Sequence, residues 1–107
     1  MASNYIVDIQ IKYKDWISKY SIFSNKPIYS IFENILFPFY KENYNQPNIP
    51  KVSFKDIETS RLVLSAEFKQ TLKLEAYEKG RTTIISLVDA VFQFYLDNHN
   101  YEEMRQD

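Results

Sequence analysis

Residues 59–98 decide the fold, and they read TSRLVLSAEFKQTLKLEAYEKGRTTIISLVDAVFQFYLDN. The stretch opens with a short β-prone run, residues 60–65, in which Leu62 and Leu64 share one face. Residues 67–79 then carry apolar side chains at helical spacing, which predicts an amphipathic helix. One face of this helix would carry Phe68, Leu72 and Ala76.

The second half of this stretch predicts a buried helix after a turn. Gly80 is the residue type that most readily ends a helix in a left-handed conformation. Ser65 is expected to cap the first helix, and Thr82 or Thr83 the second. The second helix is apolar almost all round over residues 84–96, which indicates burial on more than one side. One strand and two helices cannot bury that much surface, so this unit requires a partner.

The partner is expected within the same chain, because the sequence repeats with an offset of 55 residues. Asn25 falls on Gly80 in this alignment, and Asn is the other residue type that adopts a left-handed helix end. The apolar pattern also agrees, as at Val7 and Leu62. Identical residues fall together at Lys14 and Lys69, Phe37 and Phe92, Phe39 and Phe94, Tyr40 and Tyr95, Asn43 and Asn98, and Asn45 and Asn100.

The first copy follows the pattern less closely. Residues 5–13 alternate like a strand, with Val7, Ile9, Ile11 and Tyr13 on one side. Residues 15–24 predict a helix, and Pro27 suits the first turn of the next one. Pro38 is expected to kink or end that helix near Phe37.

The predicted organisation is one compact domain that holds two copies of a unit. A degenerate first copy spans residues 1–45, an extended linker spans 46–58, and the better-preserved second copy spans 59–100. A polar tail follows at residues 101–107.

Composition narrows the function classes. A chain of 107 residues with 45% hydrophobic residues can bury one core. It has no Cys, and its single histidine, His99, is expected on the surface, so we expect no metal, no cofactor and no enzyme. No apolar run approaches a membrane span and no signal peptide is visible, so the expected location is the cytoplasm. No small-molecule substrate is expected.

The order of strand, helix, Gly turn and apolar helix resembles the ribbon-helix-helix family of the Arc, MetJ and plasmid copy-number repressors. The resemblance covers residues 61–96, with Leu64-Ser65 closing the strand and Arg81-Thr82-Thr83 opening the second helix. Two such units in one chain are similar to certain conjugative-plasmid proteins that bind the transfer origin. The resemblance implies a mostly α fold with a short antiparallel β-ribbon, a tandem ribbon-helix-helix pseudo-dimer. It also implies sequence-specific binding of double-stranded DNA, as a transcriptional repressor or a transfer-origin (relaxosome) accessory protein.

The family's ribbon enters the major groove, which distinguishes all four base pairs. Arg61 would then face a guanine, Val63 a thymine methyl group, and Thr59 either kind of base edge. Asp8 departs from the family, because a carboxylate beside DNA is tolerable only if it accepts from a cytosine amine or pairs with a lysine. The base-facing residues implied on both strands are Thr59, Arg61, Val63, Asn4, Ile6, Gln10 and Lys12.

The starts of the second helices are expected to hold phosphates through free backbone N–H groups. In the second copy this start is Arg81, Thr82 and Thr83, and in the first copy it is Lys26 followed by Pro27-Ile28. Lys14 and Lys69, near the starts of the first helices, are further predicted phosphate contacts. The net charge of −1 counts mildly against nucleic-acid binding.

Two alternatives stay open at this point. The first alternative is a protein-interaction module, such as an antitoxin-like partner. Asp8, Pro38 and the slight excess of acidic residues favour this alternative, whereas the strand and helix-start pattern favours DNA binding. The fold is a winged helix-turn-helix if residues 51–65 form a hairpin. If the repeat is not genuine, the ribbon must form between two chains, as a homodimer or a higher assembly on DNA.

Overall fold

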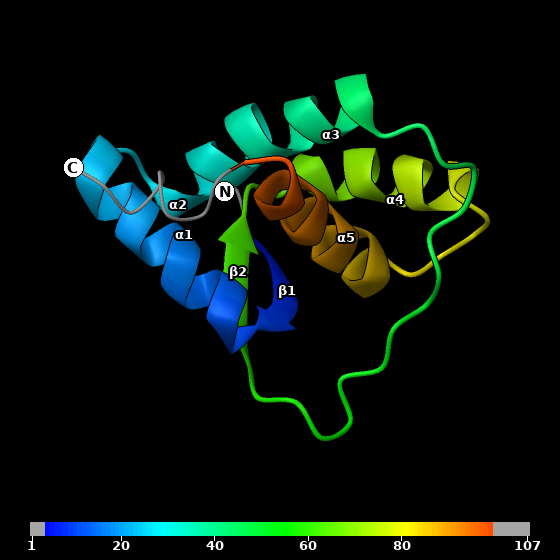
Figure 1. The fold of residues 1–107 in the computed structure, drawn as a ribbon, viewed down its shortest axis with the longest axis horizontal. Coiled ribbons are helices and arrows are strands. Elements are labelled where there is room, and N and C mark those ends of the chain that lie inside the picture. The colour runs from blue at the N-terminus through cyan, green and yellow to red at the C-terminus, as the bar shows by residue number, and fades with distance from the viewer. Residues whose placement is uncertain (1–3, 100–107) are drawn as a thin grey trace.

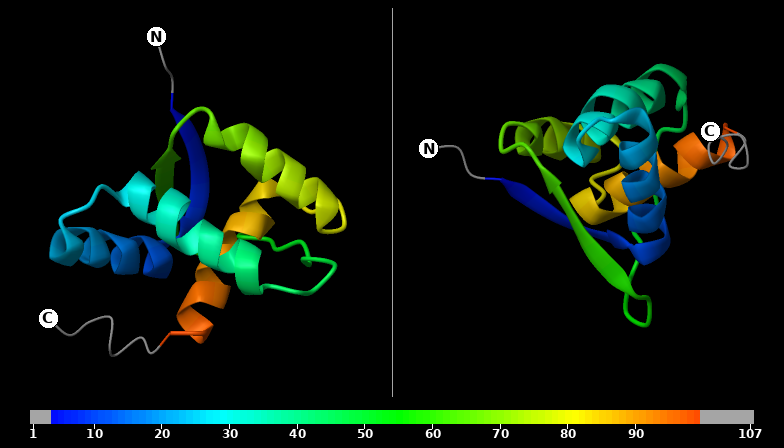
Figure 2. Two further views of the ribbon diagram at one scale, coloured as in Figure 1. Left: turned by 90° about the horizontal axis from the view of Figure 1, so that it is seen from above. Right: turned by 90° about the vertical axis from the view of Figure 1, so that its left-hand side faces the viewer.

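The computed structural model describes residues 4–99, which form a mostly helical fold with one two-stranded antiparallel sheet (Figure 1). The helices gather on one side of this ribbon, which lies at the edge of the molecule (Figure 2). No helix in this range is long and apolar enough to span a membrane. The elements in chain order are β1 (Tyr5–Gln10), α1 (Ile11–Ser24), α2 (Ile28–Ile31), the π-helical turn η1 (Phe32–Leu36), α3 (Phe37–Asn43), β2 (Thr59–Leu64), α4 (Phe68–Glu78) and α5 (Ile84–Asp97).

The two strands pair antiparallel from Tyr5 opposite Leu64 to Gln10 opposite Thr59. Successive side chains of a strand point to opposite faces, and the burial of both strands follows this alternation. The inward face is buried and carries Val7, Ile9, Leu62 and Leu64. The ribbon therefore has one face in the core and one face in solvent.

Helix α5 runs through the centre of the core, which explains its apolar pattern on all sides. The Phe92 side chain is fully buried, and its ring stacks on Tyr13 with 5.1 Å between centroids. The rings of Trp16 and Phe32 also pack against it. Burying one such side chain contributes about 1.5–3 kcal/mol. His99, expected on the surface, is half-buried and stacks on Tyr95.

The predicted turn residues between helices are confirmed. Asn25 and Gly80 both have positive φ, 58° and 81°, at the ends of α1 and α4. Thr83 caps α5, because its Oγ1 accepts a hydrogen bond of 3.0 Å from the backbone N–H of Ser86. Arg81 also adopts a positive φ of 57°, which the sequence did not indicate.

The first strand is shorter than predicted, because β1 ends at Gln10 and α1 begins at Ile11. The alternation over residues 5–13 indicated a strand to Tyr13. Tyr13, Trp16 and Ile17 also lie at helical spacing, and all three are buried. Their packing against the core fixes the helix and overrides the local alternation.

Pro38, predicted to kink or end the first copy's second helix near Phe37, does not end it. The chain stays helical from Ile28 through Asn43, with Pro38 inside the first turn of α3. The preceding turn, η1, is π-helical, and the Phe37 N–H donates to the Phe32 carbonyl. This wider turn accommodates the missing N–H and the ring of proline.

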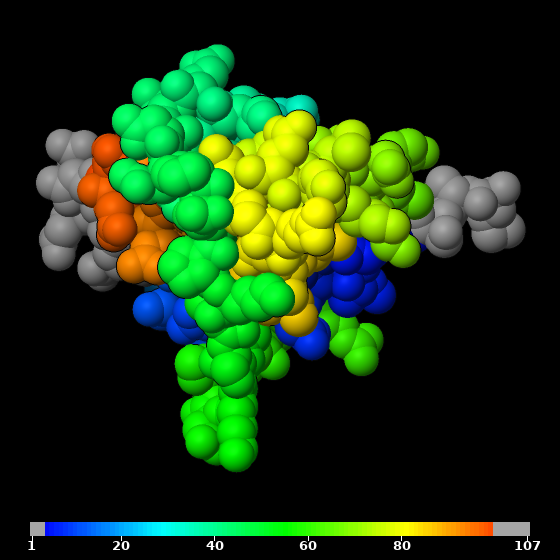
Figure 3. Space-filling view, turned by 90° about the vertical axis from the view of Figure 1, so that its right-hand side faces the viewer, coloured from blue at the N-terminus to red at the C-terminus, as the bar shows by residue number. Residues whose placement is uncertain are grey.

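Residues 46–58 connect the two halves but are only partly the open linker that was predicted. Ile49 is 4% exposed, and its N–H donates to the Lys79 carbonyl over 3.1 Å. The Val52 N–H donates to Ser86 Oγ, which fastens the connection to α5. The segment after Val52 stands out from the body (Figure 3). The winged alternative is wrong, because residues 51–58 form no strand and β2 pairs with β1.

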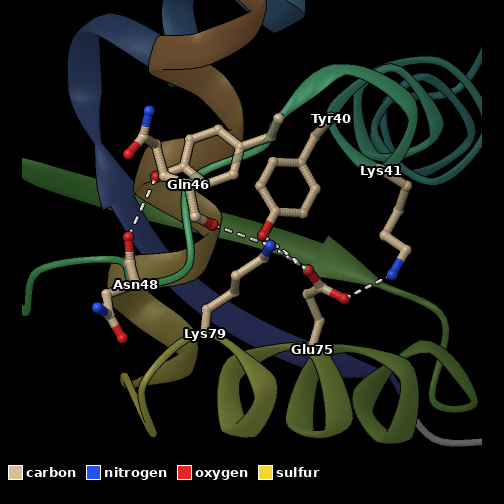
Figure 4. A network of polar contacts seen from close by, with 7 residues as sticks. Tyr40, Lys41, Gln46, Asn48, Glu75 and Lys79 are labelled. Carbon is tan, nitrogen blue, oxygen red and sulfur yellow. Dashed lines mark hydrogen bonds and ion pairs between the residues drawn. The ribbon is translucent and has the colours of Figure 1, made fainter.

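A buried carboxylate joins α3 to α4 (Figure 4). Glu75 is 5% exposed and accepts hydrogen bonds from the Tyr40 hydroxyl (2.8 Å) and the Lys41 ammonium (2.7 Å). The Lys79 ammonium lies 4.0 Å from the same carboxylate. Burial alone would raise the pKa of Glu75, but these hydrogen bonds and charges outweigh burial and lower it.

Candidate nucleic-acid interface

The outward face of the ribbon brings together most of the predicted base-facing residues. Arg61 and Val63 on β2 and Ile6 and Asp8 on β1 are all exposed. The register sets Ile6 directly opposite Val63 and Asp8 directly opposite Arg61. Thr59 is exposed at the start of β2, and Asn4 is exposed just before β1.

The charged side chains on this face, Asp8 and Arg61, form no ion pair with other described residues. Every ion pair in the described part of the chain involves Glu75, so Asp8 and Arg61 form none within 4.0 Å, not even with each other. An exposed arginine without a carboxylate partner keeps its full set of donors for a ligand. The face therefore offers one guanidinium, one carboxylate and an apolar pair.

Two of the predicted base-facing residues lie elsewhere. Gln10 is opposite Thr59 in the register, but its Nε2 donates to Asp89 Oδ1 over 2.7 Å. The chain turns into α1 at this point, so the Gln10 side chain faces α5 rather than solvent. Lys12 lies in α1 because β1 has already ended, and its ammonium is 5.2 Å from the Tyr13 ring centroid.

Each strand is fastened at its C-terminal end to a carboxylate on a helix. Glu33 accepts from the Ser65 N–H over 2.8 Å and from the Ser65 hydroxyl, just after β2. Ser65 is therefore not the predicted side-chain cap of α4. Asp89 accepts from Gln10 at the end of β1. Burial raises the pKa of Asp89, although the Gln10 hydrogen bond and the Lys12 charge offset part of this effect.

A hollow of about 320 Å³ lies at the start of α5. Thr82 is 8% exposed, and its Oγ1 is the one buried side-chain polar atom in the described residues without a hydrogen-bond partner. The backbone N–H groups of Arg81 and Thr82 are not free, contrary to prediction, because they donate to the Tyr77 and Ala76 carbonyls over 3.1 Å and 3.0 Å. The hollow is lined by Lys73, Ala76, Tyr77, Arg81, Thr82 and Ile84.

The side chains around this hollow suit an anion. Arg81 holds its guanidinium 5.2 Å from the Tyr77 ring centroid, and Lys73 lies on the same helix row as Tyr77. Two cations and an unpartnered hydroxyl therefore lie together beside the start of α5. Helix α5 packs against β1, and the hollow lies at the N-terminal end of this helix.

The other predicted phosphate residues are arranged differently. Lys26 is exposed just before Pro27, and α2 begins at Ile28 without a side-chain cap. Lys14 donates to the Arg61 carbonyl over 2.7 Å, so it supports the ribbon's backbone. The Lys69 ammonium lies 5.5 Å from the ring centroid of Tyr5.

Sequence reasoning missed several residues of this interface. Lys69, Lys73, Tyr77 and Arg81 follow one another at intervals of four along α4 and its end. That spacing places the four residues on one face of the helix, so Lys73 and Tyr77 could have been predicted from it. The carboxylates that hold the strand ends, on Glu33 and Asp89, gave no comparable signal, because their partners are distant in sequence.

Comparisons of the chain with protein-family models, with curated proteins and with solved structures give no match.

Proposed function

We propose that the chain binds double-stranded DNA sequence-specifically by inserting the β1–β2 ribbon into the major groove. The observation that carries this proposal is the outward face of the ribbon, where Arg61, Val63, Ile6 and Asp8 are exposed together. The major groove is wide enough to admit a two-stranded ribbon. The biological role would be that of a transcriptional repressor or of a transfer-origin (relaxosome) accessory protein.

The register supports a tandem ribbon-helix-helix pseudo-dimer within one chain. The 55-residue offset carries Val7 onto Leu62, and these two residues lie opposite each other at the centre of the ribbon. A pseudo-twofold axis through this pair would exchange β1 with β2. Phe39 and Phe94 are matched in the same way, and their rings are 5.6 Å apart.

Contacts within the core follow the same relation. Tyr13 packs on Phe92, and the offset carries this pair onto Phe68 and Phe37. The rings of Phe68 and Phe37 are also in contact, and both pairs have centroids 5.1 Å apart. The two contacts differ in ring angle, 8° for Tyr13 and Phe92 and 81° for Phe37 and Phe68, but their matched positions support a duplicated unit whose halves cover each other. One chain would then supply a complete ribbon without a second copy.

In the proposed complex, the ribbon reads bases and the helix starts hold phosphates. Arg61 would donate two hydrogen bonds to guanine O6 and N7, and Val63 would contact a thymine methyl group. The hollow at Thr82 would receive a backbone phosphate, with Arg81 and Lys73 beside it. The phosphate contacts would fix the position of the ribbon in the groove, and the outward side chains would choose the sequence.

Fluorescence anisotropy against duplex DNA, titrated with salt, tests this function. We expect tighter binding to a duplex from around the chain's own gene than to random DNA, weakening steeply as salt rises. Arg61→Ala should weaken specific binding by about 1–3 kcal/mol. Lys19→Ala removes an exposed charge on α1, away from the ribbon face, and is the matched control. Equal affinities of wild type and Arg61→Ala would refute reading by the ribbon.

A protein partner is the second candidate for the same face. Its charges balance, and Ile6 (48% exposed) and Val63 (43% exposed) form an apolar pair beside them. Such a face also suits an antitoxin-like contact with another protein. This candidate predicts no preference for specific DNA and no steep salt dependence in the same titration.

A further inference from the structure

We infer that the DNA site is not a palindrome and that its two halves differ in base composition, because the two ends of the ribbon's outward face differ in chemistry. This inference rests on the proposed DNA binding. Ile6 opposite Val63 makes one end of the face apolar. Asp8 opposite Arg61 makes the other end charged.

The pseudo-twofold relation makes the difference plain. The 55-residue offset carries Ile6 onto Arg61 and Asp8 onto Val63, so it would exchange the apolar pair with the charged pair. In a ribbon made by two identical chains these pairs would be the same, and the operator would mirror that symmetry as a palindrome. Here no outward position of β1 repeats its counterpart on β2. The two strands are related by a pseudo-twofold axis, but their outward side chains are not.

The charged end fits a G·C pair. Arginine binds guanine O6 and N7 with two parallel hydrogen bonds, and a carboxylate accepts from the N4 amine of cytosine. Arg61 and Asp8 are direct cross-strand neighbours, with Cβ atoms roughly 5 Å apart in such pairs. They make no ion pair with each other or with other described residues. One G·C pair would satisfy both groups, and the amine would compensate the carboxylate that DNA otherwise repels.

The apolar end fits A·T pairs. Ile6 and Val63 have no side-chain donor or acceptor, so the favourable contact they offer is with the thymine methyl group. A guanine at this place would lose water from O6 and N7 without gaining a hydrogen bond, which is unfavourable. The two ends are roughly 7 Å apart along the strands, which corresponds to about two base pairs.

The helix starts also favour a single orientation of the chain on DNA. The start of α5 presents Thr82 and Arg81 in a hollow, whereas the matched first-copy start presents Pro27 and Lys26. Neither Pro27 nor Thr82 offers a free N–H, because Pro27 has none and the Thr82 N–H donates to the Ala76 carbonyl. The two helix starts therefore differ in their side chains, since Lys73 and Arg81 lie together in the hollow. The pair of cations that suits a phosphate therefore lies at the α5 start, and the α2 start has Lys26 alone before Pro27.

Selection of duplexes from a random library, followed by sequencing, tests the inference. Wild type should enrich a non-palindromic site with G·C in one half and A·T in the other. Replacing the selected G·C pair by A·T should weaken binding roughly 5-fold to 150-fold, as one mismatch does. The double variant Ile6→Arg with Asp8→Val copies the β2 outward face onto β1 at exposed positions. It should enrich a palindrome with G·C in both halves.

The possible results separate this inference from the proposed function. A palindromic site for wild type, or the same site for wild type and the double variant, would overturn the inference and leave DNA binding intact. No enriched sequence for either protein, with circular dichroism showing both folded, would overturn the proposed DNA binding and the inference with it.

Discussion

Replacing Glu75 by alanine is expected to lower the free energy of unfolding by about 2–3 kcal/mol. Glu75 is buried, and its carboxylate accepts from the Tyr40 hydroxyl and the Lys41 ammonium, which joins α3 to α4 (Figure 4). The substitution removes the acceptor from both donors. It thereby weakens a contact between the two halves of the chain.

The magnitude follows from how exposed each donor is. Tyr40 is 1% exposed, so its hydroxyl would be left buried without a partner, which costs about 1–3 kcal/mol. The Lys41 side chain is 49% exposed and would be solvated instead, so its lost pair adds at most about 1 kcal/mol. In the Tyr40→Phe background there is no hydroxyl that could be left without an acceptor. The cost of Glu75→Ala should therefore fall there by about 1–2 kcal/mol.

Urea unfolding followed by the fluorescence of buried Trp16, the only tryptophan, measures these differences. Because the pKa of Glu75 is lowered from 4.5 in the folded state, its ionised form stabilises the fold above about pH 4.5. That contribution is lost as pH falls through the lowered pKa. The isosteric Glu75→Gln variant should therefore lose stability at pH 7 but not in strong acid. Equal stabilities at pH 7 of wild type and Glu75→Ala would refute this reasoning.

Three further outcomes are expected. Asp89→Asn should raise the free energy of unfolding at pH 7, because burial raises the pKa of Asp89 and disfavours its charged form in the fold. In urea unfolding this gain should vanish as pH falls below 3.8, where Asp89 is protonated in both states. A loss of stability at pH 7 would contradict the prediction. Gly80→Ala should lower the free energy of unfolding by about 1–2 kcal/mol in the same assay, because φ is +81° and a Cβ would collide with the Asn48 side chain. The control Ala90→Gly lies inside α5 and should lower it by about 1 kcal/mol, because glycine loses more conformational freedom in a helix than alanine does. Lys73→Ala should lower DNA affinity about equally for specific and random duplexes and reduce the slope of log affinity against log salt by about 1; an unchanged slope would remove Lys73 from the phosphate contacts.

The elements that local chemistry controls could be predicted from the sequence. Asn25 and Gly80 marked the helix ends because few residues adopt positive φ. Thr82 or Thr83 was expected to cap α5, and Thr83 does so through its hydroxyl. The alternation of Leu62 and Leu64 identified the inward face of β2 correctly.

The remaining features depend on contacts between residues that are distant in sequence. Ser65 was expected to cap α4 but is held by Glu33, 32 positions away. Ile49 was expected in an open linker, yet its side chain is buried and its N–H donates to the Lys79 carbonyl at the end of α4. Pro38 was expected to kink or end a helix, and the π-helical turn before it could not be foreseen from local propensity.

At the interface, sequence reasoning placed the β2 face correctly and erred at the end of β1. Arg61 and Val63 are exposed side by side, as the period of two requires. Lys12 was assigned to the same face because the strand was drawn too long, whereas Gln10 is the last residue of β1 and its side chain bonds to Asp89 on α5. Whether this face reads DNA stays a prediction.

The most direct test of that prediction is an amide nitrogen–proton correlation spectrum of the labelled chain, titrated with the duplex enriched from the random library. DNA docking by the ribbon predicts that the largest shifts fall on the amides of β1, β2 and the first turn of α5. Amides near Ile22 and Phe23, at the exposed end of α1, should change little. Shifts concentrated on α1 and α4, with the ribbon unaffected, would contradict the account.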